Sequence, residues 1–264
     1  MNHIRSSLSD LRQLFERTIT IRDIATSLVS FDADHCAQDV RQVMDASGFD
    51  VVGVRKHGKV VGYARHEDLG NKGVGDTMVS FNEADIFNES ERTISALEAL
   101  RTRSAMFVTV LGNVGGIITR ADLQKSPVRM WLFGLISLIE MQMLRLIRER
   151  YYDETWRQHL NEKRVADAQR VFKLREAQNE QIDLLDCLQL CDKRDICCGN
   201  PELLKATGFS SSQNGVAFLK SLESLRNALA HANDIVQGRW PELADLALEA
   251  EKFLERLEHI TLVE

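Results

Sequence analysis

Two stretches of the sequence decide the fold: residues 60–69 read VVGYARHEDL, and residues 114–123 read VGGIITRADL. They align at an offset of 54 residues, and the same offset continues without a gap toward the N-terminus. The aligned pairs are Val40 with Ile94, Val43 with Leu97, Val54 with Val108, Gly58 with Gly112, Gly62 with Gly116 and Asp68 with Asp122. A register that holds for about thirty residues indicates an internal repeat, and a repeat determines the architecture of this part of the chain.

Each copy shows the same order of predicted elements, in repeats of about 18–72 and 73–126. Apolar residues at helical spacing come first, followed by a short strand, a glycine turn and a second strand. In the two copies, the expected elements are helices at 39–46 and 93–100, first strands at 50–54 and 105–111, turns at His57-Gly58 and Gly112-Asn113, and closing short helices from about 67 and 122. A unit of about fifty residues is small for an independent fold. We therefore expect the two copies to pack together and bury a shared sheet face.

The repeat resembles a tandem pair of CBS domains (a Bateman module) over residues 18–126. The second copy carries the closing motif of that family in full, as GIITRAD at 116–122. The resemblance implies an adenine nucleotide as a regulatory ligand, with the Thr119 hydroxyl on its phosphate and the Asp122 carboxylate on its ribose. A carboxylate accepts hydrogen bonds from both hydroxyls of a diol, and Gly116 opens the strand that leads into this site.

The first copy departs from the motif. It keeps Asp68 but has Arg65 where the motif has threonine, so that Arg65 would have to reach a phosphate in its place. The family also encloses the base with apolar residues, which correspond here to Met78-Val79 and Met106-Phe107. An alternative interpretation needs no ligand: the threonine and aspartate of the motif then only cap a short helix, and the pair acts as a scaffold.

Beyond Ser126-Pro127 the alternation typical of strands ends and helical patterns begin. The expected helices are 128–160, 162–190, 201–208, 213–237 and 241–260, which predict an all-α bundle over 127–264 and an α+β fold class for the chain. In helix 213–237 the expected buried stripe consists of Leu222, Leu225, Leu229, Ala232 and Val236. The opposite face collects Glu223, Asn227, His231 and Asp234, with Arg226 on its flank. Polar and titratable side chains gathered on one helix face suggest a functional site.

The segment LRNALAH at 225–231 resembles the R-x4-H motif of HEPN domains, which are all-α modules of this size. The resemblance covers about 128–264 and is closest over 219–237. Active members of that family are metal-independent ribonucleases that work as dimers. The resemblance therefore implies an endoribonuclease with RNA as its substrate, a homodimer, and a nuclease activity that the nucleotide bound by the first half would regulate.

The residue types suit this chemistry. In the ribonuclease hypothesis, His231 is the acid and base for attack of a ribose 2′-OH on the adjacent phosphate. Arg226 donates hydrogen bonds to the phosphate oxygens in the transition state. Asn227 is a positioning group, and Glu223 is a possible partner of the histidine. Two alternatives stay open: a non-enzymatic regulator that binds an adenine nucleotide, and a module that dimerises or binds RNA or protein.

The charge balance bears on the partners. With 33 basic and 39 acidic residues the net charge is −6, which argues against a protein that coats DNA constitutively. Between Arg145 and Arg175, however, nine basic residues face five acidic ones. This segment is the natural candidate for an RNA-backbone track, and Tyr151, Tyr152 and Trp156 would stack on bases. The favoured alternative is a helix stabilised by salt bridges, with aromatic residues in the core.

The cysteines and the apolar segments bear on location. Five cysteines are an odd number, which we interpret as reduced thiols in a cytoplasmic protein. Four of them lie within 187–198, but their C-x3-C-x5-C-C spacing is not a recognised zinc pattern, so no metal is expected. Residues 1–17 predict an amphipathic helix rather than a signal peptide. The apolar window 131–147 is shorter than the roughly 20 residues that span a bilayer, which favours a buried or dimer-forming helix and no membrane partner.

Overall fold

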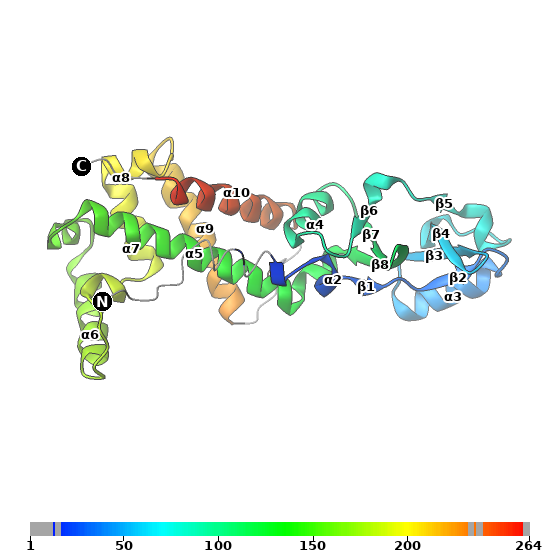
Figure 1. Ribbon diagram of the computed structural model, residues 1–264, viewed down its shortest axis with the longest axis horizontal. Helices are drawn as coiled ribbons and strands as arrows, with labels where there is room; N and C mark the ends of the chain where they lie inside the picture. Colours follow the sequence, from blue (N-terminus) through cyan, green and yellow to red (C-terminus); the bar gives the residue numbers. More distant parts are fainter. Residues whose placement is uncertain (1–12, 14–16, 232–234, 236–239, 261–264) are drawn as a thin grey trace. The chain divides into compact units, whose positions relative to one another are not determined.

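The computed structural model describes residues 13, 17–231, 235 and 240–260 (Figure 1). They form two compact units, of which one ends at Val128 and the other begins at Arg129. The first unit holds two α/β repeats, and the regular elements described in the second are all helices. The predicted α+β fold class is therefore confirmed. The helix expected at 1–17 lies almost entirely outside the described residues.

The two copies repeat one order of elements. The first consists of β2 (Ser30–Asp32), α3 (Ala37–Ser47), β3 (Val51–Lys56), β4 (Lys59–Arg65) and the 3-10 helix η1 (His66–Asp68). The second consists of β6 (Ile86–Asn88), α4 (Thr93–Leu100), β7 (Ala105–Val110), β8 (Asn113–Thr119) and η4 (Arg120–Gln124). Preceding segments are α2 (Ile21–Ile24) and β1 (Thr26–Ser27) in the first copy, and η2 (Val74–Thr77), β5 (Val79–Ser80) and η3 (Glu83–Asp85) in the second.

The predicted offset of 54 holds for both hairpin strands, since β3 and β7 begin at 51 and 105 and β4 and β8 begin at 59 and 113. It also holds for the turns between them. His57-Gly58 and Leu111-Gly112 all have positive φ, which is the conformation of a two-residue type I′ hairpin turn. The second turn was expected at Gly112-Asn113. It lies one residue earlier, because Asn113 is already the first residue of β8.

The offset does not hold for the helices. The start of α3 precedes that of β3 by 14 residues (37 to 51), whereas the start of α4 precedes that of β7 by 12 (93 to 105). The helices therefore align at an offset of 56, and the predicted pairing of Val43 with Leu97 is wrong: Val43 is 42% exposed and Leu97 is fully buried. The buried residues that correspond at the new offset are Ala37, Val40 and Met44 in α3 and Thr93, Ala96 and Leu100 in α4.

The repeats exchange their first strands. β1 pairs with β8 in a sheet of order β1-β8-β7-β6, and β5 pairs with β4 in a sheet of order β2-β3-β4-β5. Leu28, Tyr63 and Phe107 form a buried cluster that joins residues of both copies. The ring centroids of Tyr63 and Phe107 are 4.7 Å apart, and aromatic pairs of this kind add about 1 kcal/mol beyond their area burial. The expected shared core is present.

The second unit consists of eight described helical segments. They are α5 (Ser126–Arg150, whose first three residues belong to the first unit), η5 (Glu154–His159), α6 (Glu162–Glu176), η6 (Leu184–Cys187), α7 (Leu190–Gly199), α8 (Pro201–Ala206), α9 (Ser212–Ala230) and α10 (Trp240–Glu258). The helices expected at 128–160 and 162–190 are therefore broken in two or more pieces. Asn200 caps α8 through bonds to Glu202 N and Leu203 N, with proline at the first helical position as predicted.

Helix α5 is the most apolar element. Its 25 residues, with a mean hydropathy of 1.5 in the best window, suffice by length and composition to cross a bilayer. The shortness of the apolar window 131–147 therefore does not exclude that this helix crosses a membrane. In the structure, 61% of that window is buried inside the protein, and Glu140 of this helix forms an ion pair with the buried Lys193 of α7. These contacts are those of a core helix.

Candidate functional site

The closing motif of the second copy forms a helix cap. Thr119 is the last residue of β8 and the N-cap of η4, and Asp122 is the third residue of that helix. Asp122 Oδ2 accepts hydrogen bonds from Thr119 N at 2.7 Å and from Thr119 Oγ1 at 3.0 Å. The capping role that the sequence left open is therefore present. Gly116 packs tightly against β7, since a Cβ there would lie 3.1 Å from Val108 Cβ, whereas its distance of 3.5 Å from Ala25 Cβ is an ordinary contact.

Two residues that the sequence analysis did not single out complete this site. The Thr26 hydroxyl donates to Asp122 Oδ1 at 2.7 Å, and the Lys125 ammonium lies 2.8 Å from the same oxygen. Thr26 reaches Asp122 because β1 pairs with β8, with Thr26 opposite Ile117. A separation of 96 residues in the chain hides this contact from any local pattern.

The Lys125 ammonium also binds two backbone carbonyls at the end of α2 and the hydroxyl of Thr26. It donates to Ile24 O at 2.7 Å, to Ala25 O at 3.3 Å and to Thr26 Oγ1 at 2.7 Å. Together with Asp122 Oδ1, these oxygens surround one point. We call this set of acceptors (Asp122 Oδ1, Thr26 Oγ1, Ile24 O and Ala25 O) the acceptor cradle.

The Asp122 carboxylate is buried, with 7% of the residue exposed. Burial by itself raises the pKa of this carboxyl. Hydrogen bonds from Lys125, from Thr119 N–H and from Thr26 outweigh that effect and hold the pKa of Asp122 below its ordinary value. The group is therefore an ionised acceptor at neutral pH, and its four lone-pair directions already have four donors.

The corresponding aspartate of the first copy, Asp68, is not buried. Asp68 is exposed, and no hydrogen bond or ion pair joins it to any residue that the structure describes. Arg65 occupies the N-cap position without a side-chain cap bond, and its guanidinium lies 5.8 Å from the centre of the Tyr63 ring. The predicted phosphate contact from Arg65 stays a prediction.

The predicted base-enclosing residues lie in different surroundings. Met78 packs on the core of the first copy, where a Cβ on Gly62 would lie 2.7 Å from Met78 Cγ. Met106 and Phe107 are 1% and 3% exposed, so their side chains belong to the core. Of the five predicted nucleotide-binding residues, the structure brings together Gly116, Thr119 and Asp122. Asp68 lies in the first copy, and Met78, a residue of the second repeat, packs on the core of the first copy.

The predicted polar face of helix 213–237 is shorter than expected. Helix α9 ends at Ala230, and His231 is its C-cap with φ −99° and ψ 14°, outside the helical conformation. Arg129 explains part of this ending, because its guanidinium donates to the last carbonyls, Ala228 O and Leu229 O, at 3.2 and 3.0 Å. A helical position for His231 is therefore wrong. Ala232, Asp234 and Val236 lie outside the described residues.

Arg226, Asn227 and His231 lie at the C-terminal end of α9. Arg226 Nη1 donates to Asn227 Oδ1 at 3.4 Å, and both Asn227 and His231 are exposed. Glu223 does not join them. Its Oε2 accepts from Arg194 Nη1 of α7 at 2.8 Å, so the predicted pairing of Glu223 with the histidine is wrong. The Arg194 side chain is only 10% exposed, so its guanidinium requires acid partners, and Glu223 is one of two: Asp195 Oδ1 also lies 2.8 Å from Arg194 Nε.

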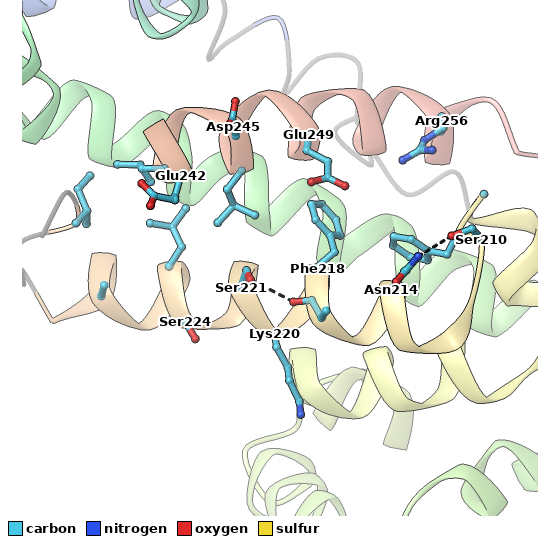
Figure 2. A pocket seen from close by; sticks show the side chains of 18 residues that line it. Ser210, Asn214, Phe218, Lys220, Ser221, Ser224, Glu242, Asp245, Glu249 and Arg256 are labelled. Carbon is cyan, nitrogen blue, oxygen red and sulfur yellow. Dashed lines mark hydrogen bonds between the residues drawn. The ribbon is translucent and has the colours of Figure 1, made fainter. Parts of the chain in front are cut away.

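A groove between α9 and α10 encloses about 1000 Å³ (Figure 2). Ser221 and Ser224 of α9 line one side, and Glu242 and Glu249 of α10 line the other. None of the four residues predicted for catalysis lines it. The groove therefore does not support the predicted catalytic site.

Most of the basic residues between 145 and 175 are paired within the chain. Seven of the nine form ion pairs with acidic side chains: Arg145, Arg148, Arg150, Arg157, Arg164, Arg170 and Arg175. Tyr151 and Trp156 are buried, while Tyr152 is 88% exposed. The alternative of a salt-bridged segment with aromatic core contacts describes this region better than an RNA track.

Three of the four clustered cysteines are buried, and Cys191 is half-buried. Cys197 and Cys198 are among the buried residues, and all five thiols are free. Burial raises the pKa of Cys198 to about 11 and also raises that of Cys197. Across the described part of the chain, no group of three or more His, Cys, Asp or Glu side chains is placed to hold a metal ion.

No protein-family model matches this chain, and no curated protein matches it significantly. Solved structures of CBS-domain proteins do align with it. CBSX2 in complex with AMP is 18% identical over 42% of this chain and 98% of its own, with a TM-score of 0.38. The CBS domain of a bacterial CNNM/CorC family Mg2+ transporter in complex with ATP is 17% identical over 46% of this chain and 94% of its own, with a TM-score of 0.36. A putative acetoin utilization protein (AcuB) from Vibrio cholerae is 16% identical over 40% and 87%, with a TM-score of 0.36.

Proposed function

We propose that the α/β unit is a CBS-type sensor that binds an adenine nucleotide and regulates the helical unit that follows it. The acceptor cradle is the observation that supports this most. Its four oxygens converge on one point, 2.7 to 3.3 Å from a single ammonium nitrogen. Acceptors gathered in this way bind hydroxyl and amino donors. A nucleoside supplies hydroxyl donors on its ribose and amino donors on adenine.

In this proposal the predicted residues keep their roles in the second copy. The Asp122 carboxylate accepts hydrogen bonds from the ribose hydroxyls, the Thr119 hydroxyl donates to the phosphate, and Gly116 allows β8 to pack tightly on β7 beside the site. At the first site, Asp68 accepts hydrogen bonds from the ribose hydroxyls, and Met78 packs against the base. The nucleotide, which is AMP, ADP, ATP or a related compound, is a regulatory ligand rather than a substrate.

The proposal extends to location and assembly. Free thiols suit a reducing compartment, and we propose a cytoplasmic homodimer without a membrane partner. Sedimentation equilibrium measures the assembly directly. A mass of twice 29.9 kDa supports the dimer, and a mass of one chain at micromolar concentration contradicts it.

Isothermal titration calorimetry with AMP, ADP and ATP tests nucleotide binding. The wild type should bind at least one of them, and Asp122→Asn and Asp68→Asn should each weaken or remove binding at their own copy. Asp39→Asn is the matched control, because Asp39 is an exposed aspartate on α3. Lack of binding to the wild type at millimolar nucleotide contradicts the proposal. Equal binding by all three variants contradicts the assignment of the carboxylates.

A second candidate function is the metal-independent endoribonuclease. The observation that favours it is that Arg226 has no acid partner among the described residues, whereas Arg194, which pairs with Glu223 of the same helix as Arg226, has one. His231 lies one helix turn beyond Asn227, exposed to solvent. In this reaction the 2′-oxygen bonds to phosphorus as the bond to the 5′-oxygen breaks, with His231 accepting the first proton and donating the second.

RNA cleavage by the purified protein in excess EDTA tests this candidate. The wild type should cleave, and Arg226→Ala and His231→Ala should each reduce the rate by at least about a hundredfold. This is the usual contribution of a general acid or base for His231 and of a donor to transition-state charge for Arg226. His259→Ala is the control, an exposed histidine on the C-terminal side of α10. Cleavage that survives both substitutions points to a contaminant. No cleavage with or without nucleotide leaves the non-enzymatic regulator as the function.

A further inference from the structure

The acceptor cradle already has an occupant, the ammonium of Lys125. An ammonium has three donor hydrogens, and here it lies within hydrogen-bond distance of four oxygens. The Asp122 side chain beneath it is 9% exposed, and the Lys125 side chain is 36% exposed. Any hydroxyl or amino group that binds in the cradle therefore has to take the place of this ammonium.

The first copy lacks this arrangement. At the offset of 54, Asn71 stands where the second copy has Lys125, and Arg65 stands where it has Thr119. Thr26 of β1 lies opposite Ile117, and Val79 of β5 lies opposite Tyr63, the residue that corresponds to Ile117. Val79 therefore takes the place of Thr26 in the first copy, and it has no hydroxyl. These three replacements explain why Asp68 is exposed without a partner, whereas Asp122 is buried and hydrogen-bonded.

We propose that Lys125 is a specificity-determining residue, which fills the ligand site of the second copy and admits a nucleotide only when its ammonium is displaced. This inference rests on the proposed nucleotide binding. It makes the two copies unequal: the first site is open, and the second is closed by a charge-assisted contact of the chain itself.

Displacement of Lys125 has a consequence for the rest of the chain. Lys125 is followed directly by Ser126, the first residue of α5, and that helix continues to Arg150. A ligand that releases the ammonium from Ile24 O and Asp122 thus frees the residue that precedes the first turn of α5. The second site is in this way linked through the covalent chain to the helix that leads into the second unit.

Calorimetric titration with AMP tests the proposal in three variants of the full chain. Lys125→Ala and Lys125→Met remove the charge, and Lys125→Met keeps the aliphatic part of the side chain if the alanine variant folds poorly. Both should bind AMP at the second site about tenfold more tightly than the wild type does, since a tenfold change corresponds to the loss of roughly one charge-assisted hydrogen bond. Lys59→Ala, an exposed lysine at the start of β4, should leave the affinity unchanged.

The outcomes separate this inference from the proposed function. Equal or weaker AMP binding by both Lys125 variants, with binding by the wild type intact, overturns the inference alone. No AMP binding by the wild type or by either variant overturns nucleotide binding and, with it, the inference. A second readout is the rate at which an amine-reactive reagent labels Lys125 relative to Lys59. That ratio should rise when saturating AMP is added, and an unchanged ratio with bound AMP shows that the ligand does not displace the lysine.

Discussion

At the scale of single residues, two aspartates at matching positions of a repeat have opposite surroundings. Asp122 accepts hydrogen bonds from Thr119 and Thr26 and pairs with Lys125, whereas Asp68 is exposed. The sequence predicted both carboxylates from one motif. It could not predict their difference, because Thr26 reaches Asp122 through the pairing of strands that are far apart in the chain.

Asp122→Asn should lower the free energy of unfolding by about 2 kcal/mol at pH 7, because it leaves a partly buried ammonium without its acid partner. The pKa of Asp122 is lowered in the folded protein from an ordinary value of 3.8. Its stabilising contribution is therefore complete above pH 4 to 5 and is lost as the pH falls through the lower, folded-state pKa. Urea unfolding at pH 7 and at pH 3 measures both effects.

Asp68→Asn is the control for that measurement, since an exposed carboxylate without a partner contributes little to stability. A loss of stability as large for Asp68→Asn as for Asp122→Asn contradicts the assignment of the two environments. So does a difference between wild type and Asp122→Asn that persists unchanged at the lowest pH at which both proteins fold.

At the scale of elements, the hairpins of the repeat and the helix at 93–100 were predictable, and the end of the helix at 213–237 was not. The turns at His57-Gly58 and Leu111-Gly112 keep an offset of 54 because a two-residue turn fixes the register of both strands. The helix expected to run to 237 ends at Ala230, where Arg129 of α5 donates to its last carbonyls. Such a cap comes from a residue about 100 positions away, which helical periodicity cannot reveal.

The contact between α7 and α9 predicts that Glu223 is a structural residue. In a double-mutant cycle with Arg194→Met and Glu223→Gln, each single substitution should destabilise the protein, and the coupling energy should be about 1–3 kcal/mol. Unfolding by urea measures all four proteins. If the two effects add within about 0.5 kcal/mol, the 2.8 Å contact between Arg194 and Glu223 contributes nothing and Glu223 is available for another role.

At the scale of the whole molecule, the division into an α/β half and a helical half followed from the repeat and from the change of pattern after Pro127. The shared core around Tyr63 and Phe107 followed from the small size of each copy. The lysine in the acceptor cradle did not follow, because a single Lys125 beside a motif has no pattern of its own. The ribonuclease function that we propose for the helical half would rest on Arg226, which is half-buried, and on His231, which is exposed, at the end of α9.

The central claim is that a nucleotide binds to the α/β unit and alters the helical unit. Amide hydrogen exchange of the full chain, with and without saturating AMP, tests it most directly. We predict slower exchange around residues 24–26 and 116–122, and a change in the first turns of α5 and beyond. No change anywhere between residues 17 and 128 would contradict nucleotide sensing, and protection confined to that unit would contradict its coupling to the helices.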